Sequence, residues 1–178
     1  MRKLVSGFTL IELIVAVGLF ALVMTLASGA YLMMIGANRQ AQALATGINN
    51  LSFALETMTR DIRTGSQYCG GGSCVPGSFS FVDTDGQPVT YGFSNSASVC
   101  GGSTTGCLTR EVGVGTVSPL TDPSVNVSSV QFLTSGTSPS DSVQARVTII
   151  VSGTVSSGPG QTQAFTVETG ATMRGTDL

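Results

Sequence analysis

Four cysteines and one isolated carboxylate are the side chains best suited to chemistry in this sequence. Cys69 and Cys74 form one close pair in Gly- and Ser-rich sequence, and Cys100 and Cys107 form another. An even number of cysteines in such segments is typical of disulfides in an oxidising compartment, whereas paired cysteines in zinc sites are usually about two residues apart. We therefore expect disulfides between close neighbours, with two crossed bridges between the pairs as the alternative.

The sequence offers no recognisable catalytic group. It contains no histidine, so the commonest general base and metal ligand near neutral pH is missing. Its serines occur without a Gly-x-Ser-x-Gly elbow or a Ser-x-x-Lys pair that would activate a nucleophile. We expect a protein that is not an enzyme and that needs no cofactor.

Asp83 and Asp85 are close enough in sequence to form a weak calcium candidate. A complete calcium loop requires about six or more oxygen ligands, and the segment 83–87 supplies only these two carboxylates. The same segment, Asp-Thr-Asp-Gly-Gln, is typical of a hairpin turn between two strands. The hairpin is the preferred interpretation, and no metal is predicted.

The charge balance argues against one class of partner. The 178 residues include 8 Lys plus Arg and 10 Asp plus Glu, which gives a formal net charge of -2. Affinity for nucleic acid depends largely on basic side chains that neutralise phosphates, so no nucleic-acid partner is predicted. Charged residues make up 10% of the chain, well below the usual share of roughly 25%, which is untypical of a cytosolic enzyme.

The isolated carboxylate is Glu12, the only charged residue between Phe8 and Ile35. The uncharged part of this segment exceeds the roughly 20 residues that a helix needs to cross a bilayer. Arg2 and Lys3 precede it, so we expect a single-pass helix with a cytoplasmic N-terminus and an extracytoplasmic C-terminal domain. Membrane lipid would surround the helix before any assembly. An unpaired Glu12 near the bilayer centre would cost about 2.5 to 3.5 kcal/mol, so a cationic partner is expected.

A secretory signal peptide is the alternative interpretation of this segment. The small residues at 27–30 could form a cleavage site for signal peptidase. The apolar core would then be longer than the roughly 7 to 15 residues usual in signal peptides, and it would contain Glu12. The membrane-spanning helix is therefore preferred.

Residues 7–13 read Gly-Phe-Thr-Leu-Ile-Glu-Leu, between a short basic leader and an unbroken apolar segment. This arrangement resembles the processing site of type IV pilins and of type II secretion pseudopilins. The resemblance implies that prepilin peptidase, a membrane aspartyl protease, cuts between Gly7 and Phe8 and methylates the new amine of Phe8. It also implies, as partners, other pilin or pseudopilin subunits and an inner-membrane assembly platform. The chain would thus move from the inner membrane into a pilus or pseudopilus.

The chemistry of the segment agrees with that role. Gly7 has no side chain to obstruct a protease, and cleavage creates a cation at Phe8, four residues from Glu12. In a filament, the amine of one subunit can pair with Glu12 of its neighbour and offset the cost of burying both charges. Glu12 is therefore predicted to form an assembly ion pair.

Helical periodicity continues beyond the apolar segment to about residue 64. Apolar residues recur there at spacings of three and four: Leu44, Ile48, Leu51, Leu55, Met58 and Ile62. Glu56 and Arg60 are spaced as an i,i+4 ion pair, and Gly65 is placed as a C-terminal cap. Residues 55–63 also resemble the end of the helix in J-type minor pseudopilins and related minor pilins, which implies a minor subunit.

After Gly65 the periodicity changes to two, which predicts antiparallel strands packed on the second half of the helix. The predicted strands are residues 79–82, 89–93, 108–112, 125–133, 143–151 and 164–169. The polar segments 134–142 and 152–161 are expected to be exposed loops. The predicted fold class is α+β and pilin-like.

The predicted organisation has four parts. They are a basic leader (1–7), a transmembrane or filament-core helix (8–36), its amphipathic continuation (37–64) and an antiparallel β-rich domain (65–178). The predicted function is a structural subunit, a minor pilin or pseudopilin, of a type IV pilus or type II secretion pseudopilus. A β-rich binding or adhesion module on a permanent membrane anchor is the alternative, and retention of residues 1–7 would favour it.

Overall fold

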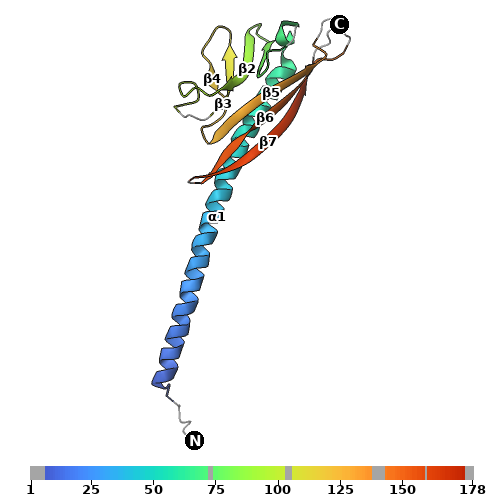
Figure 1. Cartoon of the computed structure of the whole chain (residues 1–178). Helices are drawn as coiled ribbons and strands as arrows, with labels where there is room; N and C mark the ends of the chain where they lie inside the picture. The colour runs from blue at the N-terminus through green and yellow to red at the C-terminus, as the bar shows by residue number, and fades with distance from the viewer. Residues whose placement is uncertain (1–6, 72–73, 103–105, 138–142, 159, 175–178) are drawn as a thin grey trace. The chain divides into compact units, whose positions relative to one another are not determined.

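One long helix and two antiparallel sheets form the protein, which confirms the predicted α+β class (Figure 1). The computed structural model describes residues 7–71, 74–102, 106–137, 143–158 and 160–174. Residues 1–6 of the predicted leader and 138–142 of a predicted loop lie outside the described residues. The chain divides into two units, residues 1–41 and 42–178, and each is considered by itself.

Helix α1 (Leu10–Thr64) contains 55 residues and ends where the sequence predicts. The N–H of Gly65 closes its last turn by donating to the carbonyl oxygen of Asp61 at 3.0 Å. Gly65 is not in the left-handed conformation, and a Cβ on it would overlap the ring of Phe81. The predicted glycine cap is therefore correct in position, but the residue is needed for a close approach rather than for a positive φ. A short 3-10 helix, η1 (Tyr68–Gly71), follows.

The first sheet has four strands, and the second has three. The strand order of the first sheet is β1 (Ser78–Val82), β2 (Pro88–Ser94), β3 (Cys107–Val112) and β4 (Ser118–Pro119). The order of the second sheet is β5 (Val125–Ser135), β6 (Arg146–Gly158) and β7 (Gln161–Thr172). All neighbouring strands are antiparallel. All six predicted strands are present. Strand β4 was not predicted, because its two residues are too few to show a period-two pattern.

The second sheet differs from the prediction at its strand ends. The expected loop over 152–161 is wrong, because β6 continues to Gly158 and β7 begins at Gln161. The residues of β6 stay alternately buried through Val155 and Ser157, but their small or polar side chains hide that alternation in the sequence. The expected start at residue 143 is also wrong, since Val143 is 56% exposed and precedes β6. Strand β5 likewise extends to Ser135, inside the predicted loop 134–142.

The core lies between the second half of α1 and the two sheets. Helix α1 contributes Gly47, Leu51, Ala54, Leu55, Met58 and Ile62 as buried residues. The predicted apolar face is thus confirmed from Leu51 onward, while Leu44 is only partly buried. The prediction is wrong for Ile48, which is 45% exposed, because Gly47 is the residue that faces β6 at this level.

Aromatic side chains connect the two sheets. The rings of Phe79 on β1 and Phe132 on β5 are stacked with centroids 5.6 Å apart, and Tyr68 meets Phe79 edge-on at 5.2 Å. The buried hydroxyl of Tyr68 donates to the carbonyl oxygen of Ile62 in the last turns of α1. This cluster therefore fixes both sheets to the end of the helix.

We predict that Gly47→Ala destabilises the globular unit although alanine is the better helix former. A Cβ on Gly47 would overlap Cγ1 of Val155, which is buried. Overpacking costs about 1 to 3 kcal/mol, against the roughly 1 kcal/mol that alanine gains over glycine in a helix. Thermal unfolding followed by circular dichroism should show a lower midpoint. Gly36→Ala is the control, because no atom lies within 4 Å of a Cβ there. An unchanged midpoint for Gly47→Ala would contradict the close packing of α1 on β6.

Candidate functional site

The predicted processing site lies in the short segment before α1. Gly7, Phe8 and Thr9 precede the helix and are exposed, with 80% of Phe8 accessible to solvent. A Cβ on Gly7 would have no atom within 4 Å. The peptide bond between Gly7 and Phe8 is therefore outside the helical hydrogen-bond network, in a segment that a protease can bind in extended form.

Thr9 and Glu12 define the start of the helix. The backbone N–H of Glu12 lies 3.4 Å from Oγ1 of Thr9, and the N–H of Leu13 donates to the carbonyl oxygen of Thr9 at 3.2 Å. A threonine followed three residues later by a glutamate is the sequence of a capping box. Glu12 is also the acidic residue of the first turn, where the helix dipole favours negative charge. The carboxylate is thus held one turn from the expected new N-terminus.

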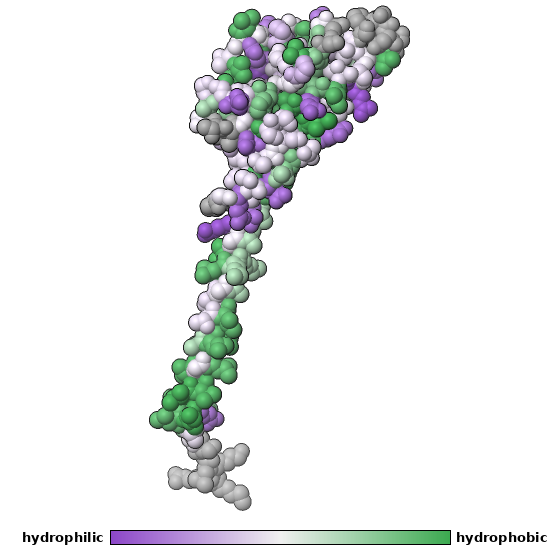
Figure 2. Space-filling model, viewed as in Figure 1, coloured by the Kyte–Doolittle hydropathy of each residue, from purple (hydrophilic) through white to green (hydrophobic). Residues whose placement is uncertain are grey.

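Glu12 is exposed on a surface that is otherwise apolar. Helix α1 includes an 18-residue window with a mean hydropathy of 2.6 in which no residue is buried. Within the described chain it is the one helix long and apolar enough to cross a membrane, by length and composition. Figure 2 shows this hydrophobic surface along the N-terminal part of α1. Glu12 shares one face of the helix with Ile11, Val15, Ala16, Leu19, Phe20 and Val23.

The four cysteines pair locally. Cys69 is bonded to Cys74 and Cys100 to Cys107, at sequence separations of 5 and 7, so the crossed alternative is not formed. The first bridge closes the segment that begins in η1, and the second closes the segment that leads into β3. Each short loop is worth about 2 kcal/mol in the chain-entropy model. The cysteines therefore act as staples for Gly-rich segments.

Asp83, the first residue of the weak calcium candidate, has a structural role in a turn. Its Oδ1 accepts the backbone N–H groups of Asp85 at 2.9 Å and of Gln87 at 2.8 Å. These bonds shape the hairpin between β1 and β2, where Val82 is paired with Pro88 as the sequence predicts. Among the residues that the structure describes, no three His, Cys, Asp or Glu side chains gather as a metal site would require.

A charged cluster that sequence reasoning missed joins the end of α1 to the first sheet. The hydroxyl of Tyr91 donates to Oδ2 of Asp61 at 2.7 Å, and Nε of Arg110 lies 3.5 Å from the same oxygen. Tyr91 and Arg110 are cross-strand partners on β2 and β3. The expected ion pair between Glu56 and Arg60 is absent among the described residues. The carboxylate near the end of α1 that does form an ion pair is Asp61, whose partner Arg110 lies on the first sheet.

Two signals for this cluster were present in the sequence. Tyr91 occupies an inward position of a predicted strand, and a buried tyrosine hydroxyl normally needs a hydrogen-bond partner. Asp61 directly precedes Ile62 of the apolar face, at the border of the core. Their pairing depends on how β2 crosses the helix, and that crossing cannot be read from periodicity.

We predict that Tyr91→Phe lowers stability at neutral pH and reduces its loss in alkali. Burial is the main reason why the pKa of Tyr91 lies well above 10.0. The hydrogen bond to Asp61 and the negative charge of Asp61 raise the pKa further, whereas Arg110 lowers it. Because the folded-state pKa is the higher one, the contribution of Tyr91 to stability is complete below about pH 10 and is lost as the pH rises further. At neutral pH the variant should lose about 1.5 to 3 kcal/mol, the usual value for a hydrogen bond to a charged group.

Urea unfolding at neutral pH and above pH 10 measures both effects. The unmodified chain should lose stability in alkali more steeply than Tyr91→Phe. Tyr31→Phe is the matched control, because Tyr31 is 65% exposed on the N-terminal part of α1. Equal alkaline slopes for Tyr91→Phe and the unmodified chain would contradict the role given to the Asp61 hydrogen bond.

The comparisons with known proteins identify the N-terminal segment. Residues 2–28 match the family model described as the prokaryotic N-terminal methylation motif. The matched segment contains Gly7, Phe8 and Glu12 and ends inside the apolar part of α1. No curated protein and no solved structure matches the chain.

The matched motif has a defined biochemical meaning. It indicates a pilin-like or pseudopilin-like chain that prepilin peptidase processes, and it is typical of structural proteins rather than enzymes. Together with the apolar part of α1, it fits a membrane-anchored pilin. The motif thus supports the type IV pilin and pseudopilin superfamily for this chain.

Proposed function

We propose that this chain is a subunit of a type IV pilus or of a type II secretion pseudopilus. The observation that carries the proposal is the methylation motif over residues 2–28, which ends in an apolar helix whose first turn holds Glu12. The antiparallel sheets on the second half of α1 form the part of the subunit that would lie outside the membrane. The role is structural, through assembly with other subunits.

The first step of this function is the removal of residues 1–7. Prepilin peptidase would hydrolyse the peptide bond between Gly7 and Phe8 and then methylate the new amine of Phe8. The exposed, non-helical placement of Gly7 and Phe8 supports this step. Cleavage leaves a cationic amine one residue before the Thr9 cap of α1.

The second step is assembly through Glu12. A carboxylate on an apolar helix surface is costly in a bilayer, and a cationic N-terminus of a neighbouring subunit would neutralise it. Such a pair forms only when the incoming subunit has the correct axial position relative to its neighbour. Glu12 would therefore set the register of addition.

Three further features support the proposed orientation and subunit type. Arg2 and Lys3 favour a cytoplasmic leader, and two disulfides suit an oxidising compartment for the globular unit. We assign the chain more narrowly to the minor subunits because residues 55–63 resemble the helix end of J-type minor pseudopilins. A minor subunit would act at the tip or in the initiation of a filament.

Mass spectrometry of the N-terminal peptide tests the proposal. The chain is produced in a host with prepilin peptidase and in a peptidase-deficient control. The expected result is a peptide that begins with N-methylated Phe8 in the first host only. An intact leader in both hosts would favour the permanently anchored binding module, whereas a new N-terminus near residues 27–30 would indicate a secreted domain. Either result would refute the proposed function.

A further inference from the structure

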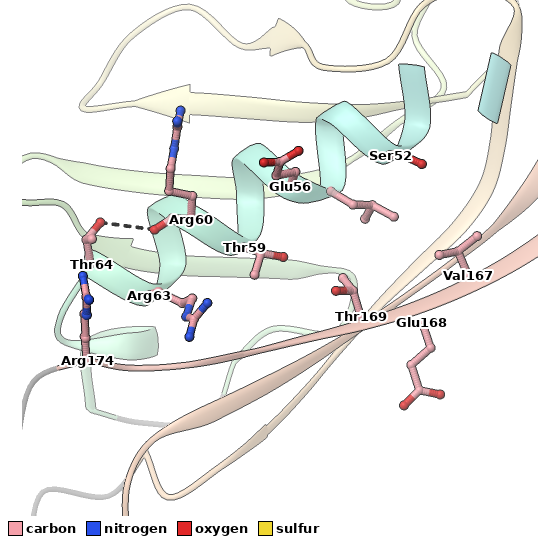
Figure 3. A pocket seen from close by; sticks show the side chains of 11 residues that line it. Ser52, Glu56, Thr59, Arg60, Arg63, Thr64, Val167, Glu168, Thr169 and Arg174 are labelled. Atoms are coloured by element: carbon pink, nitrogen blue, oxygen red, sulfur yellow. Dashed lines mark hydrogen bonds between the residues drawn. The ribbon is translucent and has the colours of Figure 1, made fainter. Parts of the chain in front are cut away.

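A groove runs between the second half of α1 and strand β7. It has a volume of about 670 Å³, and its residues all belong to the globular unit. Figure 3 shows Thr59 and Arg63 extending from α1 toward β7, while Val167 and Thr169 lie on the helix side of that strand. Glu168 points to the opposite side of β7, and Arg60 points away from the strand.

Strand β7 leaves one of its backbone edges without a partner in the described part of the chain. The order of the second sheet is β5, β6, β7, so β7 pairs with β6 on one side only. The strand is 12 residues long and contains one charged residue, Glu168, and no proline. Natural edge strands are usually short, charged or interrupted because an open edge recruits further strands. Apart from the single charge of Glu168, β7 has none of these protections.

The second sheet also covers α1 incompletely. Val147, Ile149 and Val151 of the neighbouring strand β6 are completely buried, whereas Phe165, Val167 and Thr169 of β7 are only half-buried. One more strand beside β7 would cover this half-buried face and the flank of α1. The groove follows the helix from Ser52 to Thr64. At 1.5 Å per residue this is roughly 18 Å, the length of a strand of about five or six residues.

One end of the groove is closed and cationic. The backbone N–H of Arg174, just beyond β7, donates to the carbonyl oxygen of Arg63 at 3.0 Å, which ties the end of the strand region to the helix. Both arginine side chains line the groove and are exposed. Neither forms an ion pair among the described residues. Glu56 and Glu168 also line the groove, but within the described chain neither is ion-paired with these arginines. Two neighbouring arginines that no carboxylate neutralises favour an acidic ligand.

We propose that this groove binds an extended, acidic segment of another protein chain, which adds to β7 as a fourth strand and places a carboxylate on Arg63 and Arg174. Backbone hydrogen bonds to the β7 edge would supply affinity, and the arginines would select for acidic side chains. The inference concerns the globular unit and is independent of filament assembly.

Two other occupants fit the groove less well. Nucleic acid would need a broad basic surface, and the chain has a formal net charge of -2. A second copy of β7 would bring a single carboxylate, Glu168, to the cationic end. An acidic segment satisfies both the strand edge and the arginines.

Binding of a synthetic peptide to the full chain in detergent micelles tests the inference. The probe is a fluorescent six-residue peptide of alternating threonine and valine that ends in two glutamates, with blocked termini. One control peptide carries glutamines in place of the glutamates, and another keeps the glutamates but has N-methylated alternate amides, which prevents strand pairing. Fluorescence anisotropy gives the affinity, and hydrogen exchange reports protection of residues 161–172.

We expect the acidic peptide to bind, to protect β7 and to be weakened about tenfold by N-methylation. Arg63→Gln and Arg174→Gln should each weaken binding about threefold to fivefold, the usual range for an exposed ion pair. Arg146→Gln is the matched control, since Arg146 is exposed at the start of β6 and does not line the groove. It should bind like the unmodified chain.

Several results would overturn the inference. Absence of binding, or binding that N-methylation leaves unchanged, would remove the strand addition. An equal loss in Arg146→Gln would show nonspecific attraction of charge. Tighter binding of a DNA oligonucleotide would point to nucleic acid. Self-association that the peptide does not compete with would point to a second copy.

Discussion

Gly7→Val should block processing completely and leave an uncut precursor in the membrane. A Cβ on Gly7 meets no atom within 4 Å, and the residue is not at a positive φ, so the substitution does not disturb the fold. The block would arise in the active site of the peptidase, because the valine side chain would lie directly beside the peptide bond to be cut and obstruct its binding. Mass spectrometry or a shift in gel mobility, with the peptidase present, measures the cut fraction.

Gly29→Val is the control for this experiment. A Cβ on Gly29 also has no atom within 4 Å, so the same bulk is added inside α1, at a distance from the cleavage site. This variant should be cut at the normal rate. Normal cleavage of Gly7→Val would remove Gly7 from the processing site and with it the assignment to prepilin peptidase.

Glu12→Gln should be processed and inserted into the membrane normally but should be almost excluded from filaments. Glutamine also serves at this position of a capping box, so the start of α1 at Thr9 is preserved while the charge is removed. Leaving one buried charge without its partner costs about 3 to 5 kcal/mol, which corresponds to a loss of incorporation of about a hundredfold or more. The neighbour's Phe8 amine would be the unpaired charge.

The ratio of subunit in sheared filaments to subunit in membranes measures this loss. Glu56→Gln is the control, because Glu56 is exposed on the same helix within the globular unit and forms no ion pair among the described residues. It should assemble normally. Assembly of Glu12→Gln at the level of the unmodified chain would rule out the proposed ion pair.

The fold was predictable where one physical pattern dominated. The apolar periodicity of α1 predicted its end at Thr64, and alternation predicted all strands longer than two residues. Prediction failed where small side chains hid the alternation, as at Ser157 of β6, which is buried. The prediction that Ile48 is buried was wrong because it rested on hydropathy, which ranks Ile48 above Gly47. Only a glycine at position 47 allows the helix to approach Val155, so Gly47 faces the sheet and Ile48 does not.

Some of the functional residues could be predicted from the sequence, and others could not. Gly7, Phe8 and Glu12 lie within a few residues of one another, so their relation is visible in the sequence. The local pairing of the cysteines was favoured because loop closure is cheapest between near neighbours. Asp61, Tyr91 and Arg110 come together only through the register of β2 with β3 and their crossing of α1, which no local pattern encodes.

The contacts at the end of α1 have a mechanical consequence. Within one or two turns of Thr64 the helix and its extension are bonded to the first sheet and to the segment that follows β7. These bonds join Ser66 to Val82, Asp61 to Tyr91 and Arg63 to Arg174. A tension applied along the helix would be shared among them rather than borne by one junction, so the end of α1 should resist unravelling under load. The part of α1 within the globular unit and the sheets packed on it would then respond to such a tension as one body.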